Sequence, residues 1–229
     1  MLAALNRYFS RAEKMLWTAS VVLIVSSFLA FDGENFLALT ASLIGVTSLL
    51  FNAKGNPVGQ VIGIVFCLIY GFISWQYAYY GEMITYLGMT LPMSVVTLVI
   101  WLRNPFKGNR MCVQVGRLRR SDLFWLVFLT IVITAVFGYV LAVLHTANLV
   151  PSIVSISTST IAVYLSWRRS PWFAVGYAAN DLVLIVLWSL ATIQDPGAVS
   201  VLMCFVAFFA NDLYGFRNWR RMLCQQQTA

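Results

Sequence analysis

The stretch KGNPVGQVIGIVFCLIYGFISWQYAYY, residues 54–80, sets the pattern for the whole chain. It opens with the basic residue Lys54, reaches a proline at position 57, and then runs to Tyr80 without a charged side chain. About 20 predominantly apolar residues are enough for an α-helix to cross the hydrocarbon core of a bilayer. The stretch therefore predicts a membrane-spanning helix from Pro57 to Tyr80.

Seven further stretches have the same character, and together they indicate an all-α polytopic membrane protein with eight spans. A chain of 229 residues with 60% hydrophobic and 10% charged residues cannot bury that much apolar surface in a soluble core. The predicted spans are Leu16 to Phe31, Phe36 to Phe51, Pro57 to Tyr80, Ile84 to Leu102, Leu123 to His145, Leu149 to Trp167, Pro171 to Ile193 and Ala198 to Trp219.

The distribution of charge predicts how the chain threads the membrane. All fifteen Lys and Arg residues fall at the N-terminus or in every second connection between spans. The other connections carry only acidic residues, namely Asp32, Glu34, Glu82 and Asp195. The positive-inside rule then predicts both termini in the cytoplasm and these acidic residues at the outer face. The net charge of +7 reports this topology and does not indicate binding to nucleic acid.

An internal repeat appears when the chain is shifted against itself by 114 positions. Lys54-Gly55-Asn56-Pro57 then lies on Arg168-Arg169-Ser170-Pro171. We predict two parallel three-helix units, related by an axis along the membrane normal as in several transporter folds. The division is an extra N-terminal transmembrane helix in 1–35, a first unit in 36–103, a basic loop and linker helix in 104–148, a second unit in 149–221 and a cytoplasmic tail in 222–229. Ser121-Asp122 is a candidate N-cap for the linker helix.

Two Asn-Asp pairs lie inside the last two spans, Asn180-Asp181 and Asn211-Asp212. An aspartate at the centre of a membrane helix costs on the order of 3 kcal/mol to insert, so it needs a partner or a wet cavity. Counting along the helices places Asp181 near the bilayer centre and Asp212 in the cytoplasmic half. We interpret the pairs as lining a polar pocket, mainly from the second unit. The alternative is that they only tie helices together by hydrogen bonds.

Aromatic residues at suitable depths are further candidates for the pocket wall, and any one of them could instead be simple packing. The aromatic residues at suitable depths are Phe66, Tyr70, Tyr177, Phe205 and Phe208, and Gln60, which lies between Gly59 and Gly63, is a further candidate. Trp75 fits the interfacial belt of aromatic residues, and Trp101 and Trp219, each close to an arginine, are expected as belt anchors.

The plan of three, one and three helices resembles the SWEET sugar transporters, and the second unit more closely resembles the bacterial PnuC-type nicotinamide riboside transporters. The second resemblance rests on Pro171-Trp172, Asn180, Trp188 and the run Phe208-Phe209-Ala210-Asn211-Asp212-Leu213-Tyr214-Gly215-Phe216. The matching place in the first unit reads Leu91-Pro92-Met93-Ser94, without the Asn or Gly of that run.

That resemblance implies a transporter in the bacterial inner membrane that takes up nicotinamide riboside by facilitated diffusion with alternating access and feeds NAD synthesis. The substrate site would draw on Asn180, Asp181, Trp188, Asn211, Asp212, Tyr177, Phe66, Phe208 and Gln60. We expect no cofactor and no metal. The expected surroundings are the lipid bilayer and a cytoplasmic kinase that acts on the imported substrate without stable contact. The sequence leaves homo-oligomerisation open.

Other function classes find less support. The single His145 has no nearby Cys, Glu or second His to complete a metal site, and there is no phosphate-binding glycine-rich loop. An intramembrane aspartyl-type enzyme could use Asp181 and Asp212, but it needs the two carboxyls a few Å apart, which their estimated depths make strained. A SWEET-like sugar transporter stays open. A channel is less favoured, because no charge ring or filter-like loop is visible.

Overall fold

The computed structural model describes residues 8–146 and 148–228, and most of these residues are helical. The elements in chain order are α2 (Arg11–Ser27), the π-helical turn η1 (Phe28–Asp32), α3 (Phe36–Ala53), α4 (Val58–Gln76), α5 (Tyr80–Ile84), the π-helical segment η2 (Thr85–Thr90), α6 (Leu91–Arg103), β1 (Pro105–Phe106), β2 (Asn109–Val113), α7 (Arg120–Val143), α8 (Leu149–Trp167), α9 (Phe173–Ala191), the 3-10 turn η3 (Pro196–Ala198) and α10 (Val199–Thr228).

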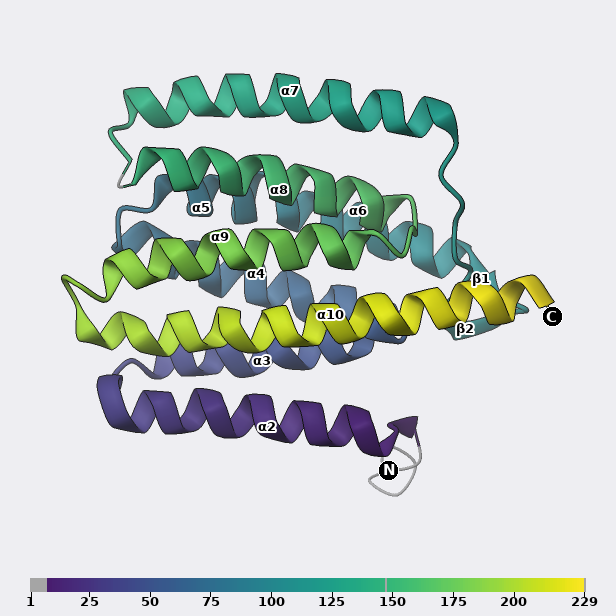
Figure 1. Ribbon diagram of the computed structural model, residues 1–229, viewed down its shortest axis with the longest axis horizontal. Helices are drawn as coiled ribbons and strands as arrows, with labels where there is room; N and C mark the ends of the chain where they lie inside the picture. The colour runs from purple at the N-terminus through teal and green to yellow at the C-terminus, as the bar shows by residue number, and fades with distance from the viewer. Residues whose placement is uncertain (1–7, 147, 229) are drawn as a thin grey trace.

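Eight helical segments among the described residues are long and apolar enough to cross a membrane, as the sequence predicts. They lie side by side and nearly parallel to one axis, with α7 along one edge of the bundle and α2 along the opposite edge (Figure 1). Helices suit this environment because they satisfy their backbone hydrogen bonds internally, which the bilayer core cannot do. The protein is therefore an all-α, multi-pass membrane protein with a two-stranded hairpin, β1–β2, in its longest connection.

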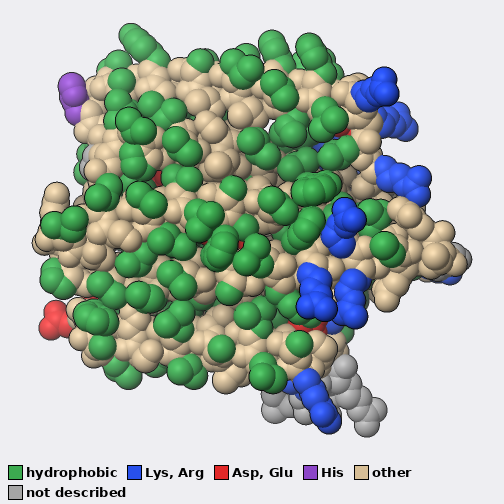
Figure 2. Space-filling view, viewed as in Figure 1, with side chains coloured by type: hydrophobic (Ala, Val, Ile, Leu, Met, Phe, Trp, Pro, Cys, Tyr) green, Lys and Arg blue, Asp and Glu red, His purple; other side chains and the backbone are tan. Residues whose placement is uncertain are grey.

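The two ends of the bundle differ in charge. In Figure 2 the Lys and Arg side chains gather at one end, and the histidine and the most prominent acidic side chain lie at the other. We call these the basic end and the acidic end; Lys54 and Arg168 mark the first, Glu34 and Asp195 the second. The apolar sides between them match a surface that faces lipid, with α7 the most exposed span.

The fourth span is broken into three pieces, α5, η2 and α6. Glu82 belongs to α5 and is fully buried, so the expectation that it is exposed in an acidic connection is wrong. The chain turns at Ala78, which has a positive φ, and the helix starts two residues later. π-helical segments often occur at functional sites because they change which side chains face a given direction.

The helices pack in a pattern that fits two similar units. α3 packs on α4 and on α10 of the other half, and α8 packs on α9 and on α6. The contact of α3 with α10 is thus matched by the contact of α8 with α6, as expected if a two-fold axis along the bundle relates the two units. The division into units by residue number stays a prediction.

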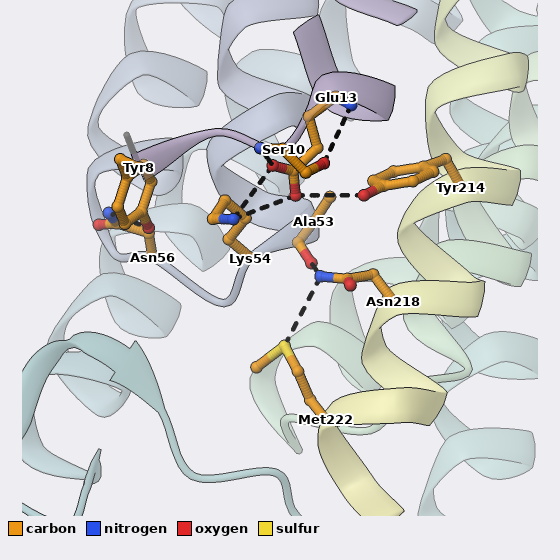
Figure 3. Close-up of polar contacts among 9 residues, drawn as sticks. All are labelled: Tyr8, Ser10, Glu13, Ala53, Lys54, Asn56, Tyr214, Asn218 and Met222. Carbon is orange, nitrogen blue, oxygen red and sulfur yellow. Dashed lines mark hydrogen bonds and ion pairs between the residues drawn. The ribbon is translucent and has the colours of Figure 1, made fainter. Parts of the chain in front are cut away.

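An unexpected equivalence concerns α2 and α7. Glu13 near the start of α2 pairs with Lys54 in the α3–α4 turn at 3.1 Å, with Tyr214 also bonded to the carboxylate (Figure 3). Asp122 near the start of α7 pairs with Arg168 in the α8–α9 turn at 2.6 Å. An ion pair thus joins the start of α2 to the turn after α3, and an equivalent ion pair joins the start of α7 to the turn after α8.

Three local expectations differ from the structure. Asp122 is not an N-cap: α7 begins at Arg120, and the Asp122 carboxylate accepts a hydrogen bond from the Arg119 backbone N–H. The interfacial-anchor prediction is wrong for Trp101 and Trp219, which are buried. Both are buried because a short hairpin and the long α10 cover this end. Their indole N–H groups donate hydrogen bonds to the backbone carbonyl oxygens of Ser166 and Asn52. α10 itself runs past Trp219 to Thr228.

Candidate functional site

A small cavity lies between the two units, in the middle of the bundle. Its volume is about 70 Å³. The lining residues come from five of the spans, and they are Gly45, Ser48, Leu49 and Asn52 of α3; Gln60, Gly63, Phe66 and Cys67 of α4; Tyr86, Thr90 and Ser94 of η2 and α6; Phe173, Tyr177 and Asp181 of α9; and Phe208 and Asp212 of α10. Ligand pockets are typically about 300–1,000 Å³, so the rings around this cavity must move apart before it can hold a nucleoside-sized molecule.

Two buried carboxyl groups meet at one wall of the cavity. Asp181 of α9 and Asp212 of α10 are 4% and 5% exposed, and their carboxyl groups lie close enough to interact electrostatically. The Asp181 Oδ2 atom has no hydrogen-bond partner among the described residues. Two adjacent buried carboxylates repel unless a proton or a cation lies between them. This wall is therefore built to attract positive charge.

The contact between these aspartates corrects the depth estimate. Counting residues from each helix end placed the two side chains at different depths. An error of one helical turn at either end is about 5 Å, as large as the predicted separation. The structure removes the depth argument against a carboxyl pair.

Aromatic rings form another part of the wall. Phe66 lies 5.3 Å from Phe208 and 5.9 Å from Tyr86, measured between ring centroids. The Phe208 ring fits because position 45 is a glycine: a Cβ there would lie 2.2 Å from the Phe208 Cζ atom. Ring faces at this spacing can stack on a flat ligand, and they favour a cation over a neutral ring.

Polar side chains of the first unit complete the wall. The Gln60 Nε2 group donates to Asn52 Oδ1 at 2.9 Å, and Asn52 Nδ2 donates to Ser48 Oγ at 3.3 Å. Gln60 thus points toward the cavity, while Gly59 allows α3 and α4 to approach closely. Thr90 and Ser94 add hydroxyl groups from the other side. The expectation that polar contacts come mainly from the second unit does not match these walls.

The two asparagines that carried the sequence argument do not line the cavity. Asn180 Oδ1 accepts hydrogen bonds from three hydroxyls of α8, on Ser155, Thr158 and Ser159, at 2.8–3.1 Å. Asn211 Nδ2 donates to Ser20 Oγ of α2 and to the Ala207 carbonyl oxygen. Both side chains join helices in this conformation, which is the alternative that the sequence left open.

Trp188 lies away from the cavity, toward the acidic end. It is fully buried, and its Nε1 group donates to Tyr70 Oη at 2.8 Å. Tyr77 closes the same end by donating to Asp195 Oδ2 at 2.8 Å. Burial and this hydrogen bond raise the pKa of Tyr77, so the phenol keeps its proton and its bond to Asp195. Trp75, by contrast, is 55% exposed, as an interfacial residue would be.

The cavity wall combines two carboxyl groups with aromatic rings and polar side chains. None of the described residues that line it is Lys, Arg or His. No group of three or more His, Cys, Asp or Glu side chains able to hold a metal occurs in 8–146 and 148–228. Arginines line a different cavity, at the basic end, formed by Ile100, Gly116, Arg117, Arg119, Trp167, Arg168 and Arg169.

Sequence reasoning missed several residues at or near the site. Ser48, Asn52, Tyr86 and Thr90 line the cavity, and the buried Glu82 interacts electrostatically with Tyr86. Asn52 and Gln60 flank the turn at 54–57 at similar depth, which is a usable signal. Tyr86 and Thr90 could not be found from helical spacing, because η2 departs from the 3.6-residue period.

Comparison with known proteins yields one family and a consistent set of relatives. The family model described as nicotinamide mononucleotide transporter matches residues 35–221. The nicotinamide riboside transporter PnuC of Neisseria mucosa is 23% identical over 215 residues, covering 91% of this chain and 81% of that protein. The Haemophilus influenzae protein of the same name is 22% identical over 195 residues, covering 83% and 81%. The crystal structure of the vitamin B3 transporter PnuC superposes with a TM-score of 0.82 at 21% identity, covering 95% of this chain and 94% of that one.

Proposed function

Since this chain belongs to the nicotinamide mononucleotide transporter family, we propose that it carries nicotinamide riboside across the bacterial inner membrane, with both termini in the cytoplasm. The observation that supports this most is the carboxyl pair of Asp181 and Asp212 in a cavity walled by aromatic rings. Nicotinamide riboside joins a flat, permanently cationic pyridinium to a polar ribose. Carboxylates offset its charge, and ring faces stabilise a cation by about 0.5–2 kcal/mol.

The hydrogen-bonding groups on the cavity wall fit the remainder of that molecule. The amides of Asn52 and Gln60 suit the ring carboxamide, and the hydroxyls of Ser48, Thr90 and Ser94 suit the ribose. A site that hydrogen-bonds a ligand hydroxyl rejects an analogue lacking it, because its own polar groups are then left unpaired.

The family description names the mononucleotide and the relatives' names give the riboside; the charges of the cavity favour the riboside. A phosphate brings about two negative charges, which would face Asp181 and Asp212 without a basic partner among the described lining residues. The described arginines lie at the basic end instead. We therefore propose that the phosphorylated form is excluded.

The proposed mechanism is facilitated diffusion by alternating access. The two units would rock about the central cavity, opening it first to one end and then to the other. A kinase in the cytoplasm would phosphorylate the imported riboside, trap it and feed NAD synthesis without stable contact with the transporter. A cationic substrate supplies the charge that the aspartate pair needs, so no coupling ion is required.

Binding to purified protein tests the substrate. We expect isothermal titration calorimetry to detect nicotinamide riboside, and to detect neither its mononucleotide nor a sugar. Asp181→Asn should weaken binding about 5- to 150-fold, because losing a buried charged partner costs about 1–3 kcal/mol. Cys67→Ala, a cavity-wall change without charge, is the matched control and should alter affinity less than about threefold. Mononucleotide binding as tight as riboside binding would overturn the substrate assignment.

Transport by proteoliposomes tests the mechanism and the rival classes. Uptake should equilibrate without accumulation, and accumulation driven by an imposed proton or sodium gradient would show that the transporter is coupled. The proximity of Asp181 and Asp212 also keeps the intramembrane aspartyl-type enzyme as a second candidate. That candidate predicts cleavage of a membrane-embedded substrate and no riboside uptake, and a SWEET-like carrier predicts uptake of a sugar.

A further inference from the structure

A third carboxyl group is buried in the bundle and has no role in the central cavity. Glu82 of α5 is 0% exposed, and neither Oε atom has a hydrogen-bond partner among the described residues. The Ser155 hydroxyl lies close enough to interact with this carboxyl group, and it also donates to Asn180 Oδ1 at 3.1 Å. An unpaired carboxyl group in the membrane interior is costly and marks a pathway for protons, ions or substrates.

Three tyrosines interact electrostatically with this carboxyl group. Glu82 lies within electrostatic reach of Tyr70, Tyr79 and Tyr86. Tyr70 and Tyr86 contact each other edge to face, with ring centroids 4.4 Å apart. A carboxylate among aromatic rings is the environment that favours an organic cation. Among the described residues the ion pairs are Glu13 with Lys54 and Asp122 with Arg168, both at the basic end, and no Lys or Arg pairs with Glu82.

The same rings connect the cavity with the acidic end of the bundle. Phe66 and Tyr86 line the cavity, and both contact Tyr70. Trp188 donates a hydrogen bond to the Tyr70 hydroxyl. The Trp188 ring in turn contacts the rings of Tyr77 and Tyr79, with centroids 5.0 and 5.3 Å away. Tyr77 reaches Asp195 at the surface. A continuous column of aromatic rings thus runs from Asp195 to the cavity, with Glu82 beside its middle.

We propose that Glu82 and the tyrosines around it form a second cation site, which a flat organic cation occupies on its way between the outer medium and the central cavity. The site rests on the proposed function, because its occupant is the pyridinium of nicotinamide riboside. Four acidic groups then mark three points on the route: Asp195 at the surface, Glu82 in the middle, and Asp181 with Asp212 in the cavity. Glu82 lowers the barrier to passage by offsetting the substrate's charge where water is excluded.

The test separates passage from final binding. In proteoliposomes, Glu82→Gln should lower the initial rate of riboside uptake about tenfold at low concentration, which corresponds to roughly 1.4 kcal/mol. The equilibrium Kd of the purified variant should stay within about twofold, since the central cavity is intact. Glu82→Asp keeps the charge and should recover most of the rate. Glu34→Gln, an exposed acidic residue at the same end, is the matched control and should leave the rate unchanged.

Each other outcome overturns the proposal. An unchanged uptake rate in Glu82→Gln removes Glu82 from the route. An equal loss of affinity and rate assigns Glu82 to the cavity or to folding, and a loss of uptake only under an imposed proton gradient makes it a proton carrier. If Glu82→Gln does not fold, as judged by thermal unfolding in detergent, Glu82→Met gives the same comparison with an apolar chain of similar length. Failure of the unaltered protein to bind the riboside would instead contradict the proposed function.

Discussion

At the scale of single residues, the polar groups inside the bundle have different tasks although the sequence presents them alike. Asn180 and Asp181 are neighbours on α9, yet one faces α8 and the other the cavity. Successive residues on a helix point about 100° apart, so adjacent positions serve different neighbours. The carboxyl groups of Asp181, Asp212 and Glu82 lack basic partners, whereas those of Glu13 and Asp122 have them.

Asn180→Ala tests this division of tasks. It removes the acceptor shared by Ser155, Thr158 and Ser159, so we expect a loss of stability of about 1–3 kcal/mol. The affinity for nicotinamide riboside should change less than about threefold, because Asn180 does not line the cavity. Thermal unfolding in detergent and calorimetric titration measure the two effects. Asp181→Asn is the control with the reverse expectation, a large loss of affinity. If Asn180→Ala lost much affinity at normal stability, Asn180 would belong to the binding site.

At the scale of elements, the fourth span shows how a break in regular structure positions a site. α5 begins after the positive-φ turn at Ala78, and η2 then turns Tyr86 and Thr90 toward the cavity. The flanking helices α2 and α7 have a simpler task. Each is fastened at the basic end by an acidic residue of its first turn, and α7 otherwise presents apolar side chains outward.

The ion pair of Glu13 and Lys54 provides a test of how α2 is held. Lys54→Met leaves the Glu13 carboxylate buried without its cation, and removing one partner of a buried pair costs roughly 3 kcal/mol. The double variant Glu13→Gln with Lys54→Met should be less destabilised than Lys54→Met alone, as measured by thermal unfolding. Arg168→Met, with and without Asp122→Asn, repeats the cycle at the equivalent pair and should follow the same order. If the stability losses of the single variants simply add up in each double variant, neither ion pair contributes to the stability of the fold.

At the scale of the whole molecule, the two ends and the middle of the bundle have separate chemistry. Arginine and lysine side chains lie at one end and the histidine at the other (Figure 2). The interior holds the carboxyl groups of Asp181, Asp212 and Glu82 together with aromatic rings. The cavity lies between units that contact each other through α3 with α10 and α6 with α8. Movement at those two contacts would open the cavity to either end.

Thiol labelling in sealed cells tests the orientation. In a background with Cys112→Ser and Cys224→Ser, which leaves only the buried Cys67 and Cys204, cysteines are introduced singly. Glu34→Cys and Asp195→Cys should react with an impermeant reagent added outside, because both positions are exposed at the acidic end. Lys107→Cys and Arg117→Cys, exposed at the basic end, should react only after the membrane is opened. The reverse pattern would invert the topology; Glu82 is unsuitable here because it is buried.

The sequence by itself determined the all-helical membrane fold, the eight spans and the gathering of basic charge at one end. Those features depend on composition and on the length of apolar runs, which the bilayer constrains directly. Only the tertiary structure decided that Asp181 meets Asp212, that Asn180 and Asn211 face other helices, and that Trp101, Trp219 and Glu82 are buried. These facts depend on helix rotation, on the π-helical break and on contacts between residues far apart in the chain. A hydropathy pattern indicates that a segment crosses the membrane, but not which neighbour each of its faces meets.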